Sequence, residues 1–161
     1  DFSEVLLHPA GDPTVGGESD ESQIAASLPI GFGVPAVADG VVAAVFDDFL
    51  AQTVVTRHAE TLRMTSFLSE EDREAAGDWP VCSVLAHVQL ATGVGPGVSS
   101  STWLAPRAFA SLAPSRTKAP PHIHLSLLAA PLSFPWETLS GWPDLLERSA
   151  RREILFLEPV V

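Results

Sequence analysis

The sequence is poor in cysteine and in basic residues, and both shortages narrow the classes of protein to which it can belong. Cys82 is the only cysteine, which excludes an internal disulfide and a metal site built from cysteines. Lys and Arg number 9 against 20 Asp and Glu, giving a formal net charge of −11. An acidic surface argues against nucleic acid and anionic membranes as main partners. No apolar run approaches the roughly 20 residues of a membrane-spanning helix, so no membrane span is expected.

Proline and glycine are plentiful by contrast, and they punctuate the whole sequence. The chain has 161 residues, of which 46% are hydrophobic, 14 are Pro and 11 are Gly. This length and composition suit one globular domain over residues 1–161 with a sizeable core. Frequent turn residues between short apolar runs favour strands over a helix bundle. We expect a mainly β fold, an antiparallel sheet or sandwich with one or two short helices.

Apolar runs bounded by turn residues indicate where the strands lie. They predict strands at residues 41–46, 53–58, 62–68, 81–88 and 154–157. Asp39-Gly40, between two apolar runs, predicts a hairpin turn that joins residues 34–38 to residues 41–46. Ser69 ahead of an acidic run predicts a short capped helix over residues 69–76. A second helix is expected over residues 144–152.

Two histidines stand two positions apart in an otherwise apolar stretch, Pro121-His122-Ile123-His124-Leu125. In a β-strand alternate side chains share a face, so both imidazoles would project together with Ile123 and Leu125 buried behind them. Such a pair is a common half of a zinc site, or a ligand beside a general base. It is equally typical of two surface histidines on an edge strand.

Several segments resemble one family, the lysostaphin/LytM-type zinc endopeptidases that cut peptide cross-links in bacterial cell walls. Residues 121–125 resemble that family's Pro-His-Leu-His-Phe strand, and residues 35–42 resemble its Pro-Val-x-Ala-Val-Ala-Asp-Gly-Val-Val segment. Residues 53–58 and 84–88 resemble two further strands. The matches occur in the family's order over residues 20–128, which leaves residues 129–161 as a C-terminal extension. The resemblance implies a sheet with a central groove and an extracytoplasmic location, periplasmic or secreted.

The family's chemistry, as the resemblance implies it, depends on one zinc ion. An early His-x-x-x-Asp supplies two ligands and the second histidine of His-x-His supplies the third. Two further histidines assist the zinc-bound water or the developing oxyanion. Zinc lowers the pKa of its bound water to about 7 and polarises the scissile carbonyl.

One alignment with the family gives an active enzyme. In it, His8, Asp12 and His124 are the zinc ligands, and His122 and His87 are the assisting catalytic residues. This active alignment predicts a zinc-dependent peptidoglycan endopeptidase. It requires an insertion, because the interval from Asp12 to the Asp-Gly segment is about twice the family's usual one.

A second alignment keeps spacings close to the family's and gives a degenerate site. Ser19 and Gln23 then replace the early histidine and aspartate, and Phe67 replaces a catalytic histidine. His124 would be the one surviving ligand, and a single imidazole cannot hold zinc. This degenerate alignment explains more residues with fewer gaps, so we favour it. It predicts a non-catalytic module, without a cofactor, that binds cell-wall peptide or a partner protein.

A third interpretation is a phosphate carrier of the sugar-phosphotransferase type. Its phosphorylated histidine would be one of His87, His122 and His124. The glycine-rich and phenylalanine-bearing context that this class has is absent around His87, so this interpretation is the weakest. Of the remaining reactive residues, Cys82 in an apolar strand is expected to be an inert core thiol. His58 is expected on the sheet, exposed or hydrogen-bonded.

Overall fold

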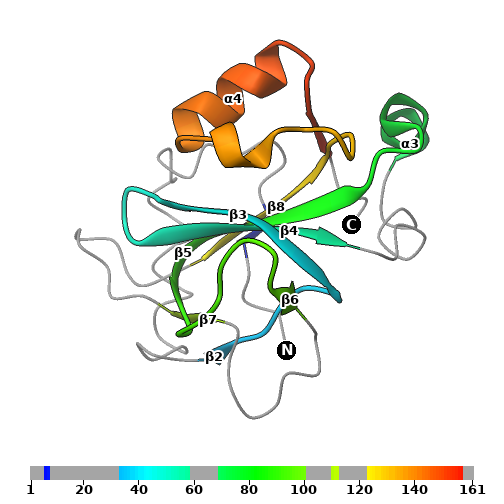
Figure 1. Ribbon diagram of the computed structural model, residues 1–161. Coiled ribbons are helices and arrows are strands. Elements are labelled where there is room, and N and C mark those ends of the chain that lie inside the picture. The colour runs from blue at the N-terminus through cyan, green and yellow to red at the C-terminus, as the bar shows by residue number, and fades with distance from the viewer. Residues whose placement is uncertain (1–5, 8–32, 59–68, 101–109, 113–122, 158–161) are drawn as a thin grey trace.

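A computed structural model of the chain describes residues 6–7, 33–58, 69–100, 110–112 and 123–157 (Figure 1). These residues form a predominantly β structure, as the sequence predicts. Its centre is a run of five antiparallel neighbours in the order β8-β5-β4-β3-β6, with β1 parallel to β8 at one edge. The strands are β1 (Leu6–Leu7), β2 (Gly33–Val34), β3 (Gly40–Asp47), β4 (Gln52–His58), β5 (Val81–Leu90), β6 (Ser99–Ser100), β7 (Ala110–Leu112), β8 (His124–Ala129) and β9 (Leu155–Leu157).

The long strand β5 organises the sheet. It pairs with β4 on one side, with β8 on the other and, near its end, with β7. Its first eight residues, 81–88, are all buried, which explains why this segment reads as a continuous apolar run. The strand predicted at residues 81–88 is therefore confirmed, and so is the strand at the end of the chain. The strand predicted at residues 62–68 lies outside the described residues.

Both faces of the sheet are covered. Helix α4 (Trp142–Ala150) and the short 3-10 helix η1 (Trp136–Thr138) lie over one face, and β2 and β7 lie under the other (Figure 1). Under α4, the indole of Trp142 packs edge-on against Phe46, with ring centroids 6.3 Å apart, and stacks on Phe156 at 6.4 Å. Leu145 of α4 is fully buried in the same apolar cluster.

Helix α3 (Glu70–Ala76) forms for the local reasons that the sequence suggests. The Ser69 hydroxyl accepts a hydrogen bond from the backbone N–H of Asp72 at 3.1 Å, so this residue caps the helix as predicted. Three acidic residues occupy the first turn, where the helix dipole favours negative charge. Gly77, with φ of 58°, ends the helix in a conformation that glycine adopts easily.

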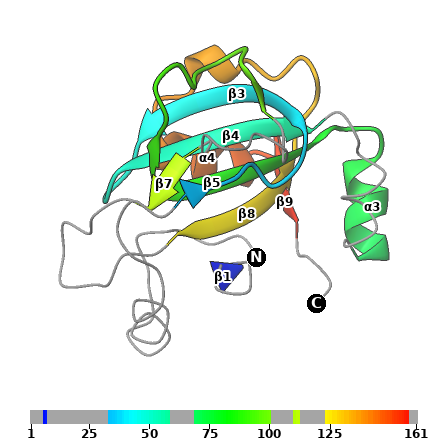
Figure 2. The ribbon, with the colours of Figure 1, turned by 90° about the horizontal axis from the view of Figure 1, so that it is seen from below.

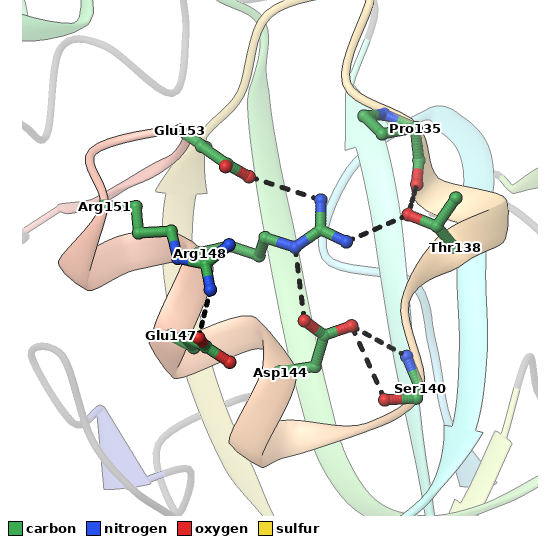
Figure 3. A network of polar contacts seen from close by, with 8 residues as sticks. All are labelled: Pro135, Thr138, Ser140, Asp144, Glu147, Arg148, Arg151 and Glu153. Atoms are coloured by element: carbon green, nitrogen blue, oxygen red, sulfur yellow. Dashed lines mark hydrogen bonds and ion pairs between the residues drawn. The ribbon is translucent and has the colours of Figure 1, made fainter.

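One arginine ties α4 to the segments around it (Figure 3). The Arg148 guanidinium donates to Asp144 Oδ1 at 3.2 Å, to Glu153 Oε2 at 3.2 Å and to Thr138 Oγ1 at 3.1 Å. It also lies 5.6 Å from the ring centroid of Phe134. Arg148 thus connects the segment before α4, the helix itself and the segment that leads to β9. The second predicted helix is confirmed, beginning two residues earlier than expected.

The hairpin predicted at Asp39-Gly40 is wrong. The segment before this turn, β2, pairs with β7, whereas β3 pairs with β4 and β6. The hairpin turn lies instead at residues 48–51, between β3 and β4. Gly40 is needed because of crowding, since a Cβ there would lie 2.3 Å from the carbonyl oxygen of Arg57. Among the described helices, none has the length and apolar character to cross a bilayer.

Candidate functional site

A buried aspartate organises the turn between β3 and β4. Asp48 Oδ1 accepts hydrogen bonds from the backbone N–H groups of Leu50 at 2.9 Å and Ala51 at 2.7 Å. Its Oδ2 accepts the hydroxyl of Thr53 at 2.8 Å. An aspartate that accepts from the backbone two and three residues ahead is a common way to close a tight turn. The turn is therefore built around this carboxylate.

The same carboxylate also holds a histidine that lies 39 positions further along the chain. The backbone N–H of His87 donates to Asp48 Oδ2 at 2.9 Å, and its Nδ1 lies 3.0 Å from Oδ1. Since an ionised carboxylate only accepts hydrogen bonds, Nδ1 carries the hydrogen. Asp48 thus accepts five hydrogen bonds across its two oxygens.

His87 has an unusual backbone. Its φ is 66°, in the left-handed region that residues other than glycine seldom adopt. Gln52 pairs with Val88 and Val54 pairs with Leu85, so two residues of β5 face one residue of β4. This is a β-bulge, which re-aims a side chain. The hydrogen bonds that Asp48 accepts from the backbone N–H and the ring of His87 stabilise the strained residue.

The pair is deeply buried and ionised at the aspartate. The side chains of Asp48 and His87 are each 1% exposed. Burial alone would raise the pKa of Asp48, but the hydrogen bonds from the His87 ring and from backbone N–H groups outweigh it and hold that pKa well below its usual range. Asp48 is therefore a carboxylate at every physiological pH.

The second histidine of the sequence motif meets this pair. His124 begins β8, opposite Ala86 of β5, and is 3% exposed. Its ring lies edge-to-face against the His87 ring, with centroids 4.9 Å apart and planes at 84°. We name Asp48, His87 and His124 the histidine cluster. The predicted site residues His8, Asp12 and His122 lie outside the described residues, as do Ser19, Gln23 and Phe67.

A polar chain links the histidine cluster to α4. The indole N–H of Trp142 donates to Thr53 Oγ1 at 2.8 Å, and the Thr53 hydroxyl donates to Asp48. Sequence reasoning missed Asp48, Thr53 and Trp142 as parts of the site. The one local signal was the aspartate between two apolar strands, which is typical of an aspartate-closed turn.

The other described histidine forms a separate buried pair. His58 is 2% exposed, and its Nε2 lies 2.8 Å from Ser83 Oγ while its Nδ1 lies 3.0 Å from the carbonyl oxygen of Asp39. Burial lowers the pKa of His58, so the ring is neutral near pH 7. A carbonyl only accepts, so Nδ1 donates to Asp39 and Nε2 accepts from the serine. His58 is hydrogen-bonded in the sheet, one of the two expected outcomes.

The histidine cluster alone does not make a zinc site. The described residues contain no group of three or more His, Cys, Asp or Glu arranged to hold a metal ion. Asp48 already accepts hydrogen bonds at both oxygens, which leaves it poorly suited to ligate a cation. Cys82 offers nothing in its place, because burial raises the pKa of its thiol to about 12.

Comparison with protein-family models, with curated proteins and with solved structures gave no significant match. In the described part of the chain, the histidine cluster is a buried unit in which Asp48 and His87 are joined by hydrogen bonds and His124 packs against the His87 ring. It holds the β3–β4 turn, the β5 bulge and α4 together.

Proposed function

We propose that this chain is a lysostaphin/LytM-like domain that binds cell-wall peptide or a partner protein without hydrolysing it. Support comes from the order of the family-like segments over residues 20–128 and from the state of the histidine cluster. The proposal includes the family's central groove as the binding surface and an extracytoplasmic location, periplasmic or secreted. Neither nucleic acid nor zinc has a part in it.

One observation carries the proposal, namely that Asp48, the one described carboxylate of the histidine cluster, is fully occupied by hydrogen bonds from the protein itself. A general base or a metal ligand must present a lone pair to substrate, water or metal. Asp48 uses both oxygens on five protein donors, and the side chains of the cluster are at most 3% exposed. Asp48 therefore has no free lone pair to act as a base or ligand, and the buried histidines beside it have little access to substrate, which supports binding over hydrolysis.

Sedimentation with insoluble peptidoglycan tests the proposal. Purified protein should sediment with the cell wall equally well in zinc and in a chelator, and no new amino groups should be released from the wall. His124→Gln should bind like the wild type, because the cluster has no contact with ligand in this account. Zinc-dependent release of amino groups, abolished in His124→Gln, would refute the non-catalytic function. Absence of sedimentation would refute cell-wall peptide as the ligand and leave a partner protein.

A second candidate, the active zinc endopeptidase, has one observation in its favour. The active alignment uses His87 and His124 in the same site, and their rings do pack together at 4.9 Å. In that function His8, Asp12 and His124 would hold zinc, and His87 and His122 would assist catalysis. His8→Ala and Asp12→Ala would then release the metal. His87→Ala would spare the metal and abolish hydrolysis.

A further inference from the structure

A second concave site lies at the other end of the sheet from the histidine cluster. It is a pocket of about 420 Å³, within the range of small-ligand sites, and it is formed where α3, the end of α4 and β9 meet. Figures 1 and 2 show α3 at the opposite end of the sheet from the β3–β4 turn. Val81, which follows α3, and His87 are six residues apart on β5, or roughly 20 Å along a strand. The pocket is therefore independent of the histidine cluster.

The walls of this pocket combine an apolar floor with opposite charges. Trp79, Ile154 and Leu155 supply apolar surface. Glu71 of α3 lies on one wall, and Arg152, just beyond α4, lies on another. These walls come from segments about 80 positions apart in the sequence, so the combination is a product of the fold.

Three polar groups of the pocket are not engaged by the protein. Within the described part of the chain, the Glu71 carboxylate, the Trp79 indole N–H and the Arg152 guanidinium make no side-chain hydrogen bond or ion pair. The neighbouring arginine differs, since Arg151 pairs with Glu147. Arg152 also has a φ of 59°, a strained conformation for a residue with a side chain. Charges of both signs beside an indole are thus available to a ligand that carries both charges and an apolar group.

We propose that this pocket binds a small zwitterion, a free amino acid or short peptide with an apolar side chain. The ligand's ammonium group faces the Glu71 carboxylate, which attracts a cation and accepts its hydrogen bonds. Its carboxylate faces Arg152, whose guanidinium suits bidentate pairing with carboxylates. The apolar side chain lies on Trp79, Ile154 and Leu155. Because the charges are partly exposed, binding weakens as salt increases.

The test is a chemical-shift titration of the full chain with the dipeptide Leu-Ala. The free dipeptide should shift the indole N–H signal of Trp79 and the backbone amide of Arg152. N-acetylated and C-amidated Leu-Ala should each bind about five- to tenfold more weakly, since each lacks one charged contact. Blocking the dipeptide leaves the protein unchanged, so this comparison does not depend on any variant folding.

Matched variants assign the two charges. Glu71→Gln should weaken binding of the free dipeptide but leave binding of the N-acetylated form unchanged. Arg152→Gln should weaken binding of the free dipeptide but leave binding of the C-amidated form unchanged. The controls are Glu74→Gln and Arg151→Gln, exposed neighbours that do not line the pocket. Equal binding of free and blocked dipeptides, equal loss in the controls, or no shift at Trp79 at any dipeptide concentration would each overturn the proposal.

Discussion

At the scale of single residues, Asp48 has the largest predicted effect on stability. Asp48→Asn replaces one accepting oxygen by an amide that donates. Either the donors on Oδ1, which include Ala51 N–H and the His87 ring, or those on Oδ2, Thr53 Oγ1 and His87 N–H, then lose their acceptor. We expect the free energy of unfolding to fall by about 3–5 kcal/mol, measured by urea denaturation. Asp47→Asn, one residue earlier and exposed, is the matched control. A loss at position 48 no larger than the control's would contradict this role.

His58 supplies a prediction about pH. Burial lowers its pKa in the folded state, so the unfolded chain binds the proton more tightly. The stabilising effect of a neutral His58 is complete above about pH 6.5, the unfolded value, and declines as pH falls toward the lower folded pKa. The wild type should therefore lose stability between pH 7 and 5 more steeply than His58→Gln, by up to about 1.4 kcal/mol per pH unit. Parallel thermal-stability curves for the two proteins would exclude this contribution.

At the scale of elements, the bulge in β5 makes glycine more stabilising than alanine at position 87, the reverse of the usual order within a strand. His87→Ala and His87→Gly both lose the imidazole, but only glycine adopts a φ of 66° without strain. We expect the glycine variant to be more stable by about 1 kcal/mol in urea denaturation. At Gln89, exposed on the same strand, alanine should be the more stable. An alanine variant as stable as glycine at position 87 would show that the bulge relaxes.

The start of β3 gives a second prediction at this scale. Gly40→Ala places a Cβ 2.3 Å from the Arg57 carbonyl oxygen and 3.1 Å from Nδ1 of His58. The strands must separate, so we expect a loss of about 1–3 kcal/mol in the free energy of unfolding. Gly95→Ala is the control, because a Cβ there meets no atom within 4 Å. Equal stability of the two variants would contradict the crowding at Gly40.

The elements that could be predicted are those specified by neighbouring residues. Ser69 caps α3 through an atom three residues away, and the apolar run of β5 reads as a buried strand wherever its partners lie. The Asp39-Gly40 hairpin failed because strand pairing is decided by distant segments, here β7 and β4. Gly40 is structurally required, but because its backbone packs closely against Arg57 and not because it forms a hairpin turn.

Of the candidate site, the sequence predicted only the residues that belong to a recognisable motif. The spacing of the histidine motif indicated a strand, and His124 is on one. Its contact with His87 is set by the pairing of β5 with β8, which is not written in either segment alone. Asp48 was missed because its carboxylate serves a histidine 39 positions away, and the left-handed φ of His87 has no signature in the sequence.

At the scale of the whole molecule, the histidine cluster is a group of buried polar side chains that connects several elements within an otherwise apolar core. It connects the β3–β4 turn and the β5 bulge, and through Thr53 and Trp142 it reaches α4. The hydrogen bonds that join Asp48 to His87 and Thr53, and Thr53 to Trp142, favour one arrangement of the elements around them. This gives the two histidines a reason to be together that needs neither metal nor substrate.

Zinc binding at equilibrium tests this account most directly. Wild-type protein and His124→Gln are dialysed against excess zinc at neutral pH, and the zinc bound per chain is measured by elemental analysis. Neutral pH matters because imidazole ligates only when unprotonated. If the histidine cluster is structural, both proteins hold the same amount of zinc, well below one per chain. One zinc per wild-type chain, lost in His124→Gln, would contradict the account and establish His124 as a metal ligand.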